Sequence, residues 1–157
     1  MSWEHVCGIG FDLQYVTDSK LANFILNHEE SYRKCRGRFT NKKRHDKIVD
    51  KTLNFIKDKK AGGNLTDDGT DLYYELAKMN ETFSIADIIA KIMSVETNIH
   101  FDVPGCTDAD EDYVLFYVEN PWELNETKKS SMIETMGQYA SELGLDVEPD
   151  VDLEYPC

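Results

Sequence analysis

The chain has 157 residues, of which 41% are hydrophobic and 11% aromatic, which is enough apolar material for the core of one domain. Its formal net charge is -13, and no apolar run approaches the roughly 18 to 20 residues that cross a bilayer. The first residues include Glu4 and His5 instead of the basic start and apolar stretch of a signal peptide. We therefore expect one cytoplasmic domain, residues 1–157, that does not associate with membranes.

The net charge is unevenly distributed along the chain. Residues 1–30 carry a net charge of -4, residues 31–60 carry +9 and residues 61–157 carry -18. Twelve of the seventeen basic residues thus lie within thirty positions. Such an asymmetry concerns association and solubility more than fold.

The cysteines favour free thiols in a reducing compartment. They are widely spaced and include no C-x-x-C pair, so they form neither a disulfide framework nor a zinc-ribbon pattern: Cys7, Cys35, Cys106 and Cys157. His5 and Cys7 stand two positions apart and could share an ion, but no partner pair accompanies them. We expect no metal and no cofactor.

Alternating apolar and polar residues predict the strands. Residues 5–15 have a period of two, which is typical of a half-buried strand. Gly8 and Gly10 within it indicate a bulge or the close approach of a neighbouring backbone, because no helix start follows them as in a phosphate-binding turn. Residues 99–103 and 113–119 predict a hairpin whose second strand is central in the sheet.

Apolar residues at helical spacing predict five helices. Ser84 and Asp87 have the spacing of a capping box before the strongest apolar face, and Asn125 can cap the last helix. The helices span about 18–30, 43–59, 66–79, from 85 onward, and 125–143. The acidic tail, 145–157, either stays loose or adds an edge strand.

The predicted fold class is α+β, with the order β-α-α-α-α-β-β-α and an optional last strand. An antiparallel sheet of three to four strands, with about five helices mainly on one face, buries these apolar stripes economically. No internal repeat and no long polar linker divides the chain.

The acidic loop between the last two predicted strands has the spacing of a calcium-binding loop. Asp108, Asp110, Asp112 and Glu119 fall at positions 1, 3, 5 and 12 of that motif. Position 6, where the turn requires glycine, is Tyr113, and a strand pattern follows. We therefore favour a solvated loop that meets a basic partner.

The basic segment has the composition of a phosphate-binding surface. Its cations surround Tyr32 and Phe39: Arg33, Lys34, Arg36, Arg38, Lys42, Lys43 and Arg44. Arginine with interleaved aromatic residues suits phosphate pairing and base stacking. No known binding module frames the segment and the body is acidic, so we expect at most a short contact made by one edge.

The acidic residues suggest a different partner surface. Asp108–Asp112, together with Asp146 and Glu148–Glu154, could occupy a groove built for a phosphate backbone and so inhibit its owner competitively. The same acidity can also serve solubility alone.

In size, acidity, α+β pattern and absence of a catalytic motif, the whole chain resembles the small acidic proteins with which phages and mobile elements disarm host defence, anti-CRISPR proteins among them. No specific motif carries the resemblance, so it implies no site residues. The basic segment departs from a uniformly acidic mimic of nucleic acid.

We expect a non-enzymatic binding and inhibitory protein that acts on a nucleic-acid-handling protein or ribonucleoprotein complex. The expected contact residues form an acidic and a basic group: Asp108, Asp110, Glu111 and Asp112, and Arg33, Lys34, Arg36, Arg38, Lys42, Lys43 and Arg44. One alternative is a small enzyme or metal-dependent hydrolase built from dispersed residues, with His5, His100 and Asp102 as starting points. Another is a structural protein that assembles head to tail through its two patches.

Overall fold

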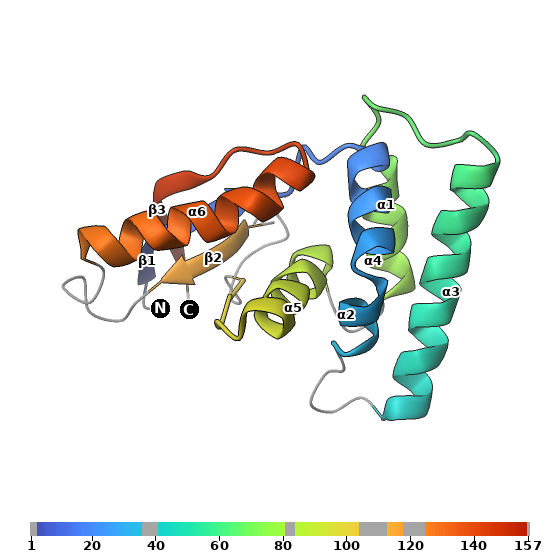
Figure 1. Ribbon diagram of the computed structural model, residues 1–157, viewed down its shortest axis with the longest axis horizontal. Coiled ribbons are helices and arrows are strands. Elements are labelled where there is room, and N and C mark those ends of the chain that lie inside the picture. Colours follow the sequence, from blue (N-terminus) through green and yellow to red (C-terminus); the bar gives the residue numbers. More distant parts are fainter. Residues whose placement is uncertain (1–2, 36–40, 81–83, 104–112, 118–124, 157) are drawn as a thin grey trace.

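The computed structural model describes residues 3–35, 41–80, 84–103, 113–117 and 125–156. These residues form six helices and one three-stranded antiparallel sheet, which confirms the predicted α+β class (Figure 1). The strands are β1 (Trp3–Asp12), β2 (Tyr113–Tyr117) and β3 (Glu148–Pro156). The helices are α1 (Asp18–Asn27), α2 (Glu29–Arg33), α3 (Lys42–Ala61), α4 (Asp71–Met79), α5 (Ile85–Thr97) and α6 (Glu126–Glu142).

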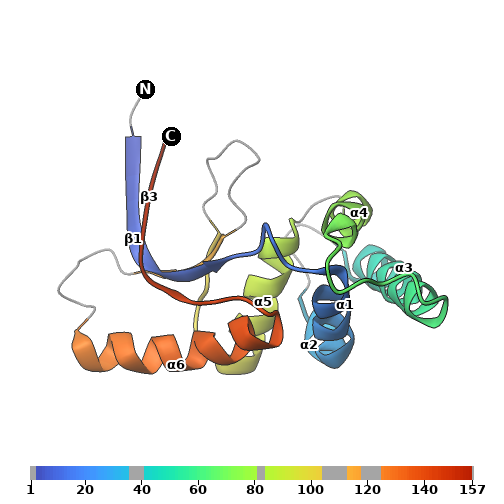
Figure 2. The ribbon, with the colours of Figure 1, turned by 90° about the horizontal axis from the view of Figure 1, so that it is seen from above.

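The sheet has the strand order β2-β1-β3, with β1 in the centre. The acidic tail supplies β3, whose Pro156 pairs with Trp3 and brings the two chain ends together (Figure 2). The prediction of a central strand at 113–119 is wrong, because β2 pairs with β1 on one side and meets 99–103 only through a single bridge from Asp102 to Leu115. Strand β1 is central because segments far away in the chain pair with it on both sides. An alternating pattern predicts a strand, but it does not specify which strands pair with each other.

Both interpretations of the glycines in β1 are confirmed. The register with β3 shifts between Gly8 and Gly10. A Cβ atom at Gly10 would lie 2.5 Å from the carbonyl oxygen of Val114 and 2.6 Å from Cδ2 of Leu115. Glycine at position 10 therefore allows β2 to approach β1 closely.

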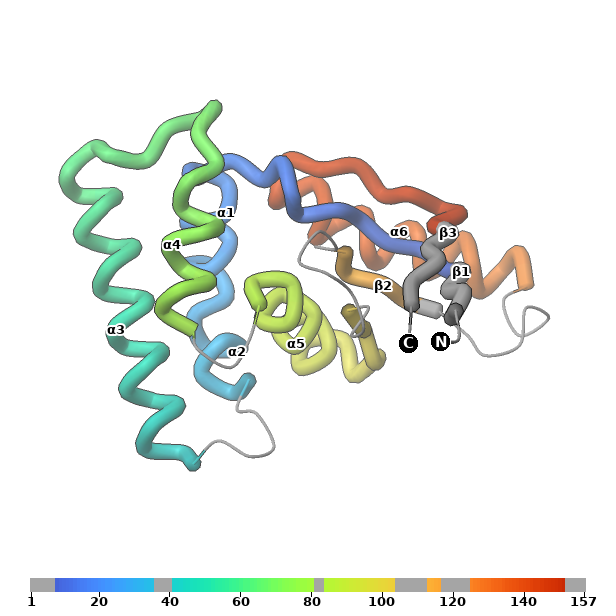
Figure 3. The backbone as a smooth tube through the Cα atoms, turned by 180° about the vertical axis from the view of Figure 1, so that it is seen from behind, coloured from blue at the N-terminus to red at the C-terminus, as the bar shows by residue number. Residues whose placement is uncertain are grey.

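Helix α5 lies between α6 and a group of four helices (Figure 1). Helix α6 lies along one face of the sheet, α5 packs beside β2, and α1 to α4 form a separate helical group (Figures 1 and 2). Helix α3 is the outermost member of that group, farthest from the sheet (Figure 3). No helix in the described ranges is long and apolar enough to span a bilayer.

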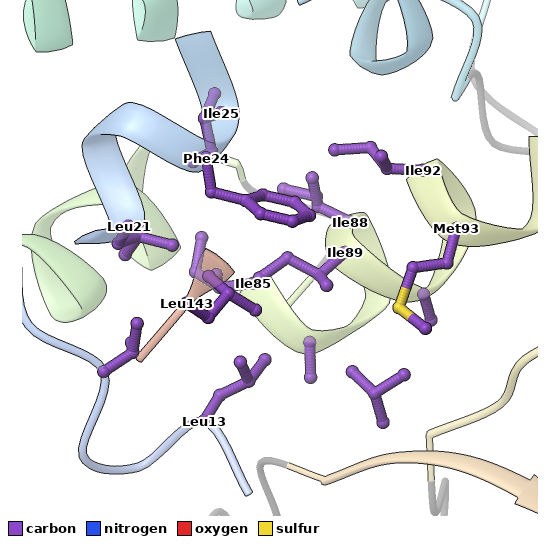
Figure 4. Close-up of a cluster of buried hydrophobic side chains, with 14 of the residues drawn as sticks. Leu13, Leu21, Phe24, Ile25, Ile85, Ile88, Ile89, Ile92, Met93 and Leu143 are labelled. Atoms are coloured by element: carbon purple, nitrogen blue, oxygen red, sulfur yellow. The ribbon is translucent and has the colours of Figure 1, made fainter. Parts of the chain in front are cut away.

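The core centres on α5. Ser84 Oγ accepts a hydrogen bond from the N–H of Asp87 at 3.1 Å, which confirms the predicted cap. All five predicted inward residues of this helix are buried, and Figure 4 shows them meeting Leu13, residues of α1 and Leu143 at the end of α6. The five are Ile85, Ile88, Ile89, Ile92 and Met93.

One helix start agrees with the prediction and another differs. Asn41 caps α3 by accepting a hydrogen bond from the N–H of Arg44 at 2.8 Å, and the helix begins at Lys42, next to the start predicted near Lys43. Helix α4 begins at Asp71 and not at Thr66, because Asp18 Oδ1 accepts a hydrogen bond from the N–H of Leu72 at 2.8 Å. A carboxylate from α1 thus supplies the cap that α4 lacks locally.

The single helix predicted over 18–30 is instead two helices. The backbone of His28 leaves the helical region, with φ of -113° and ψ of 27°, and α2 starts at the next residue. The chain turns at this point, so that α2 packs against α5 (Figure 1).

Candidate functional site

A cleft of about 340 Å³ lies between the end of α2, one side of α5 and residues 100–103. We call it the α2–α5 cleft. Its lining mixes apolar side chains with charges of both signs: Lys34, Cys35, Asp87, Ala90, Lys91, Ser94, Val95 and 100–103. A volume of this size is at the lower end of the range for pockets that hold a small molecule or one side chain of a partner.

A hydrogen bond to Ser94 joins the two walls of the cleft. Its Oγ accepts from the N–H of Phe101 at 3.2 Å and donates to the carbonyl oxygen of Ala90 on the same helix at 2.7 Å. Phe101 is buried, whereas Val95 is 44% exposed. The cleft therefore combines a fixed frame with an exposed apolar side chain.

His100 and Asp102, two residues suggested for an enzyme, lie together in this cleft. His100 Nε2 is 3.2 Å from Asp102 Oδ2, and the side chains are 81% and 40% exposed. His5, the third suggested residue, lies in β1 opposite Glu154 of β3. The structure thus brings His100 and Asp102 together.

Cys35 forms part of the same cleft, but its thiol is directed to the backbone. The side chain is buried, and Sγ donates to the carbonyl oxygen of Ser31 at 3.1 Å. Burial raises the pKa of this thiol to about 12. The charge of Lys91 lowers the pKa, and the charge of Glu96 raises it. The thiol remains protonated near neutral pH, and a protonated thiol is a poor nucleophile.

The cleft adjoins two segments that carry most of the predicted contact residues. Cys35 directly precedes 36–40, and Val103 directly precedes 104–112. Six predicted residues lie in these segments, outside the described residues: Arg36, Arg38, Asp108, Asp110, Glu111 and Asp112. The basic and the acidic segment therefore both leave the described fold from the lining of one cleft.

Two of the described basic residues are engaged in ion pairs within the protein. Arg33 donates from Nη1 to Asp50 at 2.7 Å and from Nη2 to Glu29 at 3.1 Å. The hydrogen bond with Asp50, followed by that with Glu29, raises the pKa of Arg33. Lys34 Nζ lies 3.7 Å from Glu30 Oε1. Arg33 therefore joins α2 to α3 as well as contributing charge to the surface.

The remaining described residues of the predicted basic group, Lys42, Lys43 and Arg44, form the exposed first turn of α3. The prediction stopped at Arg44, although exposed lysines continue along the helix at Lys47 and Lys51. The sequence predicts a helix over 43–59, so the four-residue spacing of these lysines already indicated a common face.

A search of known protein-family models, curated proteins and solved structures finds no match to this chain.

A second polar cluster lies where α1, α5 and α6 meet. His28 contacts Glu96 at 2.7 Å and Glu142 at 2.9 Å, and Glu96 also accepts from Ser31 at 2.6 Å and from Tyr139 at 3.0 Å. Neither here nor elsewhere in the described ranges do three or more His, Cys, Asp or Glu side chains have the arrangement of a metal site. The calcium-like spacing that ends at Glu119 lies outside these ranges.

Proposed function

We propose that the protein is a non-enzymatic binding protein that inhibits a nucleic-acid-handling protein or ribonucleoprotein complex. The observation that carries the proposal is that Cys35 and Val103, which directly precede 36–40 and 104–112 in the chain, line one cleft. A protein that handles nucleic acid has a basic groove for phosphates beside acidic surface. Such a protein can bind the acidic segment of this chain in its groove and the basic segment on its acidic surface. Small acidic inhibitors from phages and mobile elements, which this chain resembles, act on such targets.

The α2–α5 cleft has the composition of a protein-binding site. Val95 is exposed, and charged residues of both signs surround the apolar part of the lining. Binding energy at protein interfaces is concentrated in a few apolar anchors within a polar rim. An apolar side chain of the partner that packs on Val95, in a cleft whose lining also carries Lys34 and Asp87, fits this pattern.

The chemistry of the cleft favours binding over catalysis. The thiol of Cys35 is protonated and donates to a backbone oxygen, and it is the nucleophile type that His100 and Asp102 would have to activate. His100 is instead an exposed side chain paired with Asp102 at the surface. Such a pair can orient a partner's polar group at the rim of an interface.

An affinity experiment on the tagged full-length protein tests the proposal. Val95→Glu places a charge on the apolar anchor, and Tyr74→Glu is the matched control, because Tyr74 is 56% exposed on α4 and does not line the cleft. We expect wild type and Tyr74→Glu to retain the same nucleic-acid-binding protein from a lysate of the source cells at low salt. Val95→Glu should lose it, by about tenfold or more in affinity.

Inhibition is then measured on the purified partner. Wild type should reduce the partner's nucleic-acid binding or turnover in a stoichiometric titration, and Val95→Glu should not. Recovery of no partner at low salt, retention of the partner equally by both variants, or binding without any effect on the partner's activity would each contradict the proposal.

A further inference from the structure

The outward face of α3 carries a row of three lysines that no described residue neutralises. Lys43, Lys47 and Lys51 are all exposed, and within the described ranges none of them has an ion-pair partner. They stand four residues apart, which corresponds to a spacing of about 6 Å along the helix and a row of about 12 Å. Figures 1 and 3 show α3 at the edge of the molecule.

The direction of the row follows from the buried face of the helix. Its buried residues are His45, Val49, Thr52, Leu53 and Ile56. Successive residues of a helix are rotated by about 100° around its axis. On α3 the direction opposite to the centre of the buried face falls on Lys47, and Lys43 and Lys51 lie about 40° to either side of it. The lysines therefore point away from the core and not toward neighbouring helices.

The acidic residues of the same half of α3 lie to one side of the row. Asp50 is held by Arg33 at 2.7 Å, and Asp46 is half-buried. The first turn has no acidic residue and begins with Lys42, Lys43 and Arg44, a placement that the helix dipole disfavours. Charges that oppose local stability in this way are typical of residues kept for contact with another molecule.

We infer that Lys43, Lys47 and Lys51 bind the phosphate backbone of a single-stranded nucleic acid, a contact separate from the α2–α5 cleft. Lysine interacts with phosphate as a point charge, so the row binds without reading bases. A straight row of this length reaches about three phosphates, while the net charge of -13 repels the broad surface of a duplex.

A further feature favours nucleic acid over a membrane surface. Phe55, the apolar residue next to the row, is half-buried against the core, with Lys59 Nζ 5.3 Å from its ring centroid. Helices that bind membrane surfaces carry apolar residues beside their lysines for insertion. The apolar residues of α3 face the core instead.

The test is fluorescence anisotropy of a labelled single-stranded oligonucleotide, as RNA and as DNA, with the full-length protein over about 50 to 200 mM salt. For three phosphates, log Kobs should fall against log[salt] with a slope of about -2. The Lys43→Gln, Lys47→Gln, Lys51→Gln triple variant should bind about tenfold more weakly at low salt and lose most of this slope.

The matched control changes three exposed lysines elsewhere, with the same change in net charge: Lys20→Gln, Lys60→Gln and Lys128→Gln. It should retain the affinity and the slope, and glutamine preserves helix in both variants, which circular dichroism verifies. The inference is overturned if wild type shows no salt-dependent binding, if both triple variants lose binding equally, or if the row is needed only for anionic vesicles or an acidic protein. None of these results bears on Val95, so failure here is distinct from failure of the proposed function.

Discussion

His28 and Glu142, 114 positions apart in the chain, lie within hydrogen-bond distance, with 2.9 Å between Nε2 and Oε2. The other ring nitrogen of His28, Nδ1, lies 2.7 Å from Oε2 of Glu96. An imidazole that faces carboxylates at both nitrogens satisfies both contacts only when it is protonated, because a carboxylate accepts and does not donate. The charged ring therefore joins the α1–α2 corner to the ends of α5 and α6.

The pKa values of this cluster shift in the directions that the contacts require. Burial is the largest single effect on His28 and lowers its pKa, but the hydrogen bonds with Glu142 and Glu96 together outweigh it and raise the pKa above 6.5. For Glu96, burial raises the pKa, and the hydrogen bonds from Ser31, His28 and Tyr139 outweigh it and lower the pKa below 4.5. Burial, and then the bond to Glu96, raises the pKa of Tyr139.

These directions predict a pH dependence of stability. Since the pKa of His28 is raised in the folded state, its contribution is complete below about pH 6.5 and is lost as the pH rises through the folded-state pKa. The contribution of Glu96 is complete above about pH 4.5 and is lost as the pH falls through its folded-state pKa. Both are complete at about pH 5.5.

Replacement of His28 with glutamine tests this dependence by urea unfolding. We expect His28→Gln to lower the free energy of unfolding by about 1 kcal/mol near pH 5.5 and by clearly less near pH 8.5, because the partly exposed ion pairs are modest in strength. His100→Gln is the control, since His100 is 81% exposed and bonded to Asp102 alone among the contacts described. A His28→Gln effect that is equal at the two pH values would contradict the role of the imidazolium.

Local signals predicted most of the elements. The Ser84 cap and the Asn125 cap both form, the latter by accepting from the N–H of Lys128 at 2.8 Å. The cap of α4 escaped prediction because it comes from Asp18, 54 positions before Leu72. Contacts of this kind depend on how helices meet, and no local pattern contains that information.

The candidate site could be predicted only in part for the same reason. His100 and Asp102, two of the dispersed residues suggested for an enzyme, do form a pair. Val95 and Lys91 lie on α5, where the sequence pattern indicates only a helix with a buried stripe. They line a cleft because the chain turns at His28 and α2 then packs on α5. The apolar spacing predicts one continuous helix over 18–30 and so gives no sign of this turn.

The close approach at Gly10 predicts a strong dependence on side-chain size. The added Cβ of Gly10→Ala would meet the backbone oxygen of Val114 at 2.5 Å, and this oxygen cannot move without opening the β1–β2 pairing. We expect the free energy of unfolding to fall by about 2 to 3 kcal/mol in urea titrations.

A second glycine provides the matched control for this substitution. Gly137 lies inside α6, and a Cβ there meets only Cγ2 of Val147, at 4.0 Å. Gly137→Ala should therefore leave stability unchanged or raise it by up to about 1 kcal/mol, because alanine is the better helix former. Equal effects of the two substitutions would show that β2 does not approach β1 at Gly10.

A buried hydrogen-bond network joins α2, α3 and α4. Tyr32 donates to Asn80 Oδ1 at 2.7 Å, and Asn80 Nδ2 donates to the carbonyl oxygen of Leu76 at 2.9 Å and to Thr52 Oγ1 of α3 at 3.4 Å. Asn80→Ala leaves the buried hydroxyl of Tyr32 without this acceptor, so we expect a loss of about 2 to 3 kcal/mol in the free energy of unfolding. Tyr32→Phe removes the donor and should cost about 1 kcal/mol. The reverse order would contradict the network.

The state of Cys35 predicts a thiol that reacts only when the fold opens. Burial raises its pKa from 9.0 to about 12, which reduces the thiolate fraction near pH 8 by about a thousandfold. Peptide-level mass spectrometry after iodoacetamide treatment should show labelling of Cys35 slower by about two to three orders of magnitude in native protein than in urea, with the same residue as its own reference. Equal rates in the two conditions would mean an accessible thiolate beside His100 and Asp102, and the α2–α5 cleft would then have to be considered as a site of thiol chemistry.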